Sequence, residues 1–208
     1  MNRIPGLRAT LAEDLAAYRE RTGSRLPRWQ LLLLPLNPAL TALVLMRVAC
    51  WLHQKRMGVL ARALYAFNVY FTGLEVRPEA VIGPGVFIPH PNGVMLAPVR
   101  IGRNAILAPR SGMGARGGWE DDGMPVVGDN VTVYLNSTVL GPVHIGDDVV
   151  IAGYSMVTID VPAASLVAGA PARVLRPLRP DEIVAQRRRS ERTRPVPESL
   201  LKASEAAT

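Results

Sequence analysis

Aliphatic residues recur at every sixth position through the second half of the chain. The unbroken run is Val127, Val133, Val139, Ile145, Ile151 and Val157. Small or branched residues follow four positions after each of them, at Val131, Ser137, Val143, Val149, Ser155 and Val161. A helix would need a period of about 3.6 residues and an amphipathic strand a period of about two, so neither explains this spacing. The pattern predicts a triangular parallel β-coil in which each aliphatic residue points inward.

The same period is present upstream, with one shift of register. It runs through Val76, Ile82, Ile88 and Val94, and after one extra residue it continues through Ile101 and Leu107. Twelve such hexads, at three to a turn, make about four coils. We therefore expect a mainly β domain over residues 74–175.

A loop interrupts this repeat at residues 109–125. Its sequence, PRSGMGARGGWEDDGMP, contains five glycines and three adjacent carboxylates, Glu120, Asp121 and Asp122. Long loops on a rigid scaffold often carry function, although three acids in a row also suit a solvated loop tip.

Helices are expected before the coil, in residues 1–73. Helical spacing connects the apolar residues Leu11, Leu15 and Tyr18. Residues 29–46 carry no charge, but two prolines break the run near its middle, and the piece that follows is too short to span a bilayer. We interpret that piece as a buried helix rather than as a membrane contact. A further helix is predicted over about 57–72, with Gly73 as its C-cap.

The positive charge of the chain lies outside the predicted coil. The net charge is +7, with ten lysines and arginines against three acids in residues 1–73 and eight against five in residues 176–208. Residues 74–175 carry six against nine. A nucleic-acid-binding protein would more often carry its basic residues on the folded core, so we expect no nucleic-acid partner. The basic C-terminal tail, 176–208, is interpreted as a short solvated helix and a frayed end rather than as a site for an anionic partner.

Composition and cysteine content favour a folded cytoplasmic protein. Hydrophobic residues make up 49% of the chain and charged residues 20%. Cys50 is the single cysteine, which excludes an intramolecular disulfide and suits a reducing compartment. The opening sequence MNRIPGLRATLAEDL contains no apolar signal region.

His90 is the candidate catalytic residue among three histidines. His53 falls in a predicted helix and His144 within a regular coil, whereas His90 occupies an outward polar position in the sequence IPHPNG. Histidine titrates near neutral pH, so it can take a proton from an attacking hydroxyl and return it to a leaving group. We expect no metal site, because these three histidines are not placed to converge. No P-loop, dinucleotide fingerprint or Cys-His nucleophile pair is present either.

Hexapeptide coils of this kind resemble the left-handed parallel β-helix acyltransferases, and within that group the sequence is similar to the serine O-acetyltransferases. The resemblance covers about residues 11–175. It rests on the segments FTGLEVRPEAVIGPGVFIPH, VYLNSTVLGPVHIGDDVVIAGYSMVTIDVP and AGAPARVL, and on the helical stretch ALVLMRVACWLHQKRMGVLARALYAFNVYFTG. The resemblance implies a left-handed β-helix preceded by a short α-helical segment. It also implies a homotrimer with active sites between neighbouring subunits, which acetylates serine from acetyl-CoA in cysteine biosynthesis.

Only some of the family's functional residues have counterparts. His90 falls on the family's catalytic histidine. The aspartate usual before it is Pro89, the usual Arg-His pair of the loop falls on Gly123 and Met124, and the acid of an N-terminal Asp-Pro pair falls near Thr22. The groups expected to hold serine or to support the base are therefore absent at these positions.

The resemblance also suggests supporting residues. Glu120, Asp121, Asp122 or a backbone carbonyl would orient His90. Trp119 would either cap the pocket or pack on a neighbouring subunit. Asn136 and Gly153 fall on family positions that accommodate the pantetheine arm of CoA, and Arg173 is placed to reach its 3′-phosphate region, although small corner residues are also needed by the coil itself.

Three functions follow as hypotheses. The first is an acetyl-CoA-dependent O-acetyltransferase of the serine acetyltransferase type. The second acylates a sugar, a polysaccharide precursor or another small hydroxyl or amine, and in one variant works at a membrane surface, since basic residues flank the apolar helices. The third is a non-catalytic β-helix scaffold.

Overall fold

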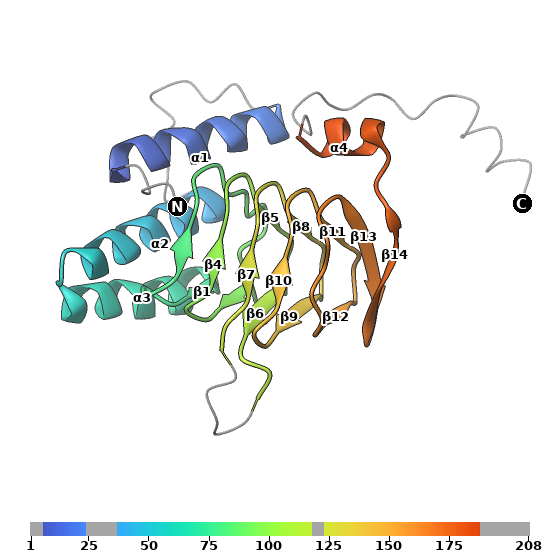
Figure 1. Cartoon of the computed structure of the whole chain (residues 1–208). Coiled ribbons are helices and arrows are strands. Elements are labelled where there is room, and N and C mark those ends of the chain that lie inside the picture. The colour runs from blue at the N-terminus through green and yellow to red at the C-terminus, as the bar shows by residue number, and fades with distance from the viewer. Residues whose placement is uncertain (1–5, 24–36, 118–122, 188–208) are drawn as a thin grey trace, which may run out of the picture.

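The computed structural model describes residues 6–23, 37–117 and 123–187. Three helices precede the strands and one follows them (Figure 1). They are α1 (Leu7–Thr22), α2 (Pro38–Gln54), α3 (Gly58–Thr72) and α4 (Pro180–Arg187). The expected C-cap is confirmed, because Gly73 is left-handed with φ of 74° and its amide donates to the carbonyl of Val69.

Short strands wind into a coil with three flat faces (Figure 1). Face A contains β1 (Glu75–Val76), β3 (Met95–Leu96), β6 (Gly112–Gly114), β9 (Thr138–Leu140) and β12 (Met156–Val157). Face B contains β2 (Val81–Ile82), β4 (Arg100–Ile101), β7 (Val126–Val127) and β10 (His144–Ile145). Face C contains β5 (Ile106–Leu107), β8 (Thr132–Val133), β11 (Val150–Ile151), β13 (Ser165–Gly169) and β14 (Ala172–Pro177). Every strand pair is parallel except β13 with β14, where the chain turns back and ends the coil.

The aliphatic residues of the six-residue repeat fill the centre of the coil, as the sequence predicts. All the aliphatic residues of the unbroken run from Val127 to Val157 are buried. The second set is buried too, including the hydroxyls of Ser137 and Ser155, which donate to the carbonyl of Ala152. The core is therefore one continuous column of branched side chains.

Glycines allow successive coils to approach at the corner between faces B and C. A Cβ added to Gly102 would lie 2.6 Å from the carbonyl carbon of Gly128, one coil further on. A Cβ on Gly83 would meet Gly102 at a similar distance. Only glycine fits where backbones are this close.

A ladder of amides follows the same corner. Asn104 donates its side-chain amide to Asn130 at 3.0 Å, and Asn130 donates to Asp148 at 3.1 Å. Arg187 of α4 closes the ladder by donating to both oxygens of Asp148. Residues of this kind tolerate the left-handed conformation that each coil needs at its corner.

The helical segment covers the N-terminal end of the coil. Asp14 of α1 and Arg47 of α2 form a buried ion pair that also contacts the first coil at Ile82 and Gly83. Most of α2 is buried, as expected for the apolar run that the prolines interrupt. Within the described ranges, no helix has both the length and the apolar character needed to cross a bilayer.

Candidate active site

A groove of about 350 Å³ runs along face A. Its floor is mostly apolar, and its N-terminal end carries polar groups from the first coil. The lining residues are Glu75, Arg77, Met95, Leu96, Ala97, Pro98, Gly112, Met113, Gly114, Ala115, Thr138 and Leu140. The groove opens where alternating residues of β1, β3, β6 and β9 point away from the core.

Glu75 and Arg77 provide charge at the N-terminal end of this groove. The Tyr65 hydroxyl of α3 donates a hydrogen bond of 3.1 Å to Glu75. The guanidinium of Arg77 lies over the ring of Tyr65, 5.9 Å from its centre. Burial and the bonded carboxylate of Glu75 both raise the pKa of Tyr65, so this phenol stays protonated as a donor.

His90 lies at the corner that leads from face C to face A. Phe87 bridges to face C just before it, and β3 of face A begins shortly after it. This corner contacts the junction between α3 and β1, where the backbone amide of Gly93 donates a hydrogen bond of 3.0 Å to the carbonyl of Gly73. Gly73 has a φ of 74°, and a Cβ on it would lie 3.2 Å from Cα of Asn92, so glycine is strongly favoured at the end of the FTG sequence.

The imidazole of His90 is exposed. In the part of the chain that the structure describes, it makes no hydrogen bond or ion pair. Trp119 and the proposed orienting residues Glu120, Asp121 and Asp122 lie outside the described residues. The ring of His90 is therefore open to solvent and to a bound ligand.

Two of the expected CoA-binding positions lie on the same edge of the coil as His90. Asn136 follows β8 and Gly153 follows β11, so both turn the chain from face C to face A. Asn136 takes the left-handed conformation, with φ of 54°, and its amide donates to Pro109 one coil earlier. Neighbouring coils are about 4.8 Å apart, so His90 and Asn136, two coils apart, are separated by about 10 Å along this edge.

Arg173 lies beyond the coil proper. It is on β14, next to β13, and its guanidinium donates to the carbonyl of Ala172 at 2.9 Å. Its side chain is exposed.

The positions that differ from the family motif are structural in this chain. Met124 packs against the hydrophobic core, and a Cβ on Gly123 would lie 3.1 Å from Cβ of Pro142. The Thr22 hydroxyl donates to the carbonyl of Tyr18 within α1 and does not line the groove. Pro89 is half-buried beside His90. Neither Gly123 nor Met124 can provide a charge for an acceptor.

Sequence reasoning missed Glu75. The sequence did contain a signal for it. Val76 points inward, so the preceding residue, Glu75, must point outward from the first coil, close to the FTG sequence. Within the described ranges, no group of three residues is placed to hold a metal ion.

Comparisons with known proteins agree with this architecture. Residues 124–158 match the family model described as bacterial transferase hexapeptide (six repeats). The chain is 34% identical to a serine acetyltransferase of Helicobacter pylori over 170 residues, which cover 81% of this chain and 94% of that protein. It is 35% identical to a serine acetyltransferase of Synechococcus elongatus over 167 residues, covering 80% and 68% of the two chains. The structure of soybean serine acetyltransferase complexed with serine superposes with a TM-score of 0.74 at 31% identity, covering 82% of this chain and 70% of that one.

Proposed function

This chain belongs to the serine acetyltransferase family, and we propose that it transfers the acetyl group of acetyl-CoA to a hydroxyl acceptor with His90 as the general base. Its parallel coil is the left-handed β-helix of that family. Acetyl-CoA is the acyl donor.

The reaction requires one proton to move twice. His90 takes the proton of the acceptor hydroxyl as its oxygen attacks the thioester carbonyl carbon. The tetrahedral intermediate collapses, the carbon–sulfur bond breaks, and the imidazolium returns the proton to the thiolate of CoA. A general base of this kind raises the reaction rate roughly 10²–10⁴-fold.

One observation carries this proposal: the edge between faces C and A that presents His90 also presents Asn136 and Gly153. An extended donor such as CoA needs a binding surface that continues over several coils and ends at the base. The open backbone corners along this edge provide that surface. The exposed ring of His90 stands at its N-terminal end, and face A, which carries the groove, begins beyond this edge.

The same geometry supports a homotrimer whose sites lie between subunits. The described ends of the loop, 115–117 and 123–125, leave the coil between faces A and B, whereas His90 is on the edge between faces C and A. The width of face A separates the two edges by about 10 Å, three residues of strand. A loop from a neighbouring chain would complete the site without crossing that face.

Serine is the first acceptor to test, and a neutral hydroxyl compound such as a sugar is the second. The second is favoured by a specific observation, because Gly123 and Met124 replace the charged pair of the family and pack structurally. In the groove, the charges come from Glu75 and Arg77 instead.

The test is release of free thiol from acetyl-CoA with a panel of acceptors: L-serine, hexoses, amino sugars and simple alcohols. Wild type is compared with His90→Ala and with the matched control His144→Ala, which removes an exposed histidine from face B. We expect acceptor-dependent release that is lost in His90→Ala and kept in His144→Ala.

The panel separates the hypotheses. Turnover of serine at millimolar or lower KM identifies serine as the acceptor. Turnover of sugars with serine ignored identifies a rebuilt acceptor site on the same base. Silence throughout, from folded protein that binds acetyl-CoA, would favour the scaffold, and equal activity of wild type and His90→Ala would remove His90 from the mechanism.

A further inference from the structure

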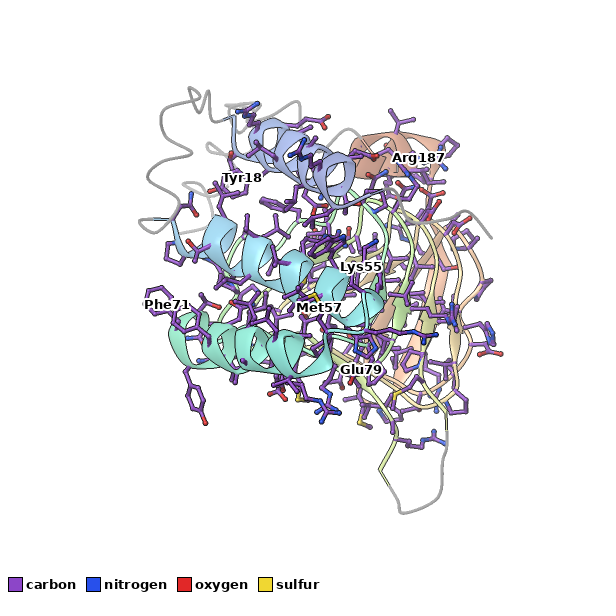
Figure 2. All side chains as sticks on the ribbon, turned by 90° about the vertical axis from the view of Figure 1, so that its left-hand side faces the viewer. Tyr18, Lys55, Met57, Phe71, Glu79 and Arg187 are labelled. Atoms are coloured by element: carbon purple, nitrogen blue, oxygen red, sulfur yellow. The ribbon has the colours of Figure 1, made fainter. Side chains whose placement is uncertain are left out.

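The outer face of α3 is apolar and uncovered (Figure 2). The view looks onto the end of the molecule where α2 and α3 lie, with Met57 and Phe71 near the two ends of α3. The large exposed side chains of this face are Met57, Val59, Leu60, Phe67, Tyr70 and Phe71. Val59 is 89% exposed and Tyr70 is 91% exposed, so these side chains do not pack at the edge of the hydrophobic core.

These residues form one continuous surface. At 100° per residue, the positions from Arg62 through Val59, Tyr70 and Phe67 to Phe71 cover about half of the helix circumference. The rings of Phe67 and Phe71 stack at 5.3 Å. Opposite them, Ala61 and Asn68 are buried against the rest of the protein. Within α3, whose residues are all described, Arg62 is the single charged residue.

The charged residues of α3 and of the turn that precedes it have one sign. The sequence from residue 38 to residue 72 contains no aspartate or glutamate. Lys55, Arg56 and Arg62 are exposed, and in the described structure none of them is paired with a carboxylate. The two acids of the first coil are already engaged, Glu75 by the Tyr65 hydroxyl and Glu79 by Arg77 at 3.5 Å.

We propose that the exposed face of α3 docks on an anionic phospholipid surface. An interfacial helix needs an apolar face that enters the acyl boundary and cations that meet the headgroups, and α3 with its flanking Lys55, Arg56 and Arg62 offers both. Tyrosine is well suited to this boundary because its ring is apolar and its hydroxyl is polar. A second copy that packed its own α3 against this face would bring the same cations together, with no carboxylate in residues 38–72 to balance them. The proposal does not depend on which acceptor is acetylated.

The experiment is flotation of the full chain with vesicles, without substrate. Phosphatidylcholine vesicles are compared with vesicles that also contain an equal amount of phosphatidylglycerol. The apolar test variant is Phe67→Ser/Tyr70→Ser/Phe71→Ser. Its matched control, Val174→Ser/Leu175→Ser/Val184→Ser, removes three exposed apolar residues from β14 and α4. The charge test variant is Arg56→Gln/Arg62→Gln. Its matched control, Arg100→Gln/Arg179→Gln, changes the net charge by the same amount away from α3.

We expect wild type to float with the anionic vesicles, and to do so less as salt is raised. Both α3 variants should lower the partition coefficient by about tenfold or more, while both controls keep it. Wild type that stays with the soluble fraction would overturn the proposal. So would unchanged binding by the α3 variants, or a fall in oligomer size caused by the serine variant, since that would show a second copy covering this face. Circular dichroism of each variant verifies folding.

Discussion

Asp14 and Arg47, 33 residues apart, form a bidentate ion pair that is almost completely shielded from solvent. The two nitrogen–oxygen distances are 2.7 and 3.0 Å. Arg47 also donates to the carbonyls of Ile82 and Gly83, and Asp14 accepts from the amides of Gly85 and Val86. The pair thus joins α1, α2 and the first corner of the coil. Its burial is compensated because these polar atoms have partners.

Removing one charge of this pair should destabilise the fold strongly. Asp14→Asn keeps the shape but leaves the Arg47 guanidinium buried without a counter-charge, which costs about 3–5 kcal/mol. The control is Glu13→Gln, which breaks the half-exposed pair with Arg103 and should cost about 1 kcal/mol or less. Urea denaturation of both variants measures the difference. Equal losses would show that the buried pair has no special role.

Gly102→Ala should destabilise the coil. The added Cβ would meet the backbone of Gly128 at 2.6 Å, so adjacent coils must move apart at a cost of about 1–3 kcal/mol or more. Gly58→Ala is the control, since nothing lies within 4 Å of its Cβ and alanine favours the first turn of α3. Thermal melts should show a lower Tm for the first variant and an equal or higher Tm for the second.

The stability of the protein should fall in mildly alkaline solution through Cys50. Burial raises the pKa of this thiol to about 11, an effect that the nearby Arg47 charge only partly offsets. An unfolded thiol loses its proton near pH 8.5, whereas the folded one keeps it up to about pH 11, so the folded state binds more protons in this window. The contribution is complete below about pH 8.5 and is lost as pH rises to about 11, by about 3 kcal/mol.

This pH effect is measured as a difference between two proteins. Unfolding free energies of wild type and Cys50→Ala are compared at several pH values across the alkaline window. The pKa of Tyr65 is also raised, but this residue is present in both proteins, so its contribution to the pH dependence cancels in the difference. The wild-type curve should descend more steeply, and parallel curves would contradict the assignment to Cys50.

Glu75 should contribute to acetyl transfer. In the described structure it is the carboxylate that lines the groove, held there by Tyr65. We expect Glu75→Gln to lower kcat/KM by about tenfold, or about 1.4 kcal/mol, because the negative charge that lines the groove is lost. Tyr65→Phe should have a smaller effect in the same direction. Glu79→Gln, outside this groove, serves as the control, and a loss as large as that of Glu75→Gln would point to a general effect of charge on the first coil.

The oligomeric state can be measured independently of activity. Sedimentation equilibrium should give three times the mass of the 22.5 kDa chain. Co-expression then tests shared sites: a His90→Ala chain mixed with a chain lacking residues 115–122 should regain part of the activity that each lacks alone. A monomer with full activity would contradict a site between subunits.

The sequence alone determined the coil and its register. Its six-residue period places Val127, Val133 and their equivalents inward because each face is a short local strand, and the side-chain direction within a strand follows from position. The cap at Gly73 and the outward position of His90 were predicted for the same reason, since both depend on a few adjacent residues.

The tertiary structure decided the features that join distant segments. The pairing of Asp14 with Arg47 and the placement of Glu75 in a groove with Leu140 depend on how the coils and helices stack, which no local pattern encodes. The helix at residues 58–72 is apolar on almost every side, so its sequence could not show which face is buried and which is open. The packing of Met124 onto the core was hidden likewise, because a loop residue has no periodicity to reveal its direction.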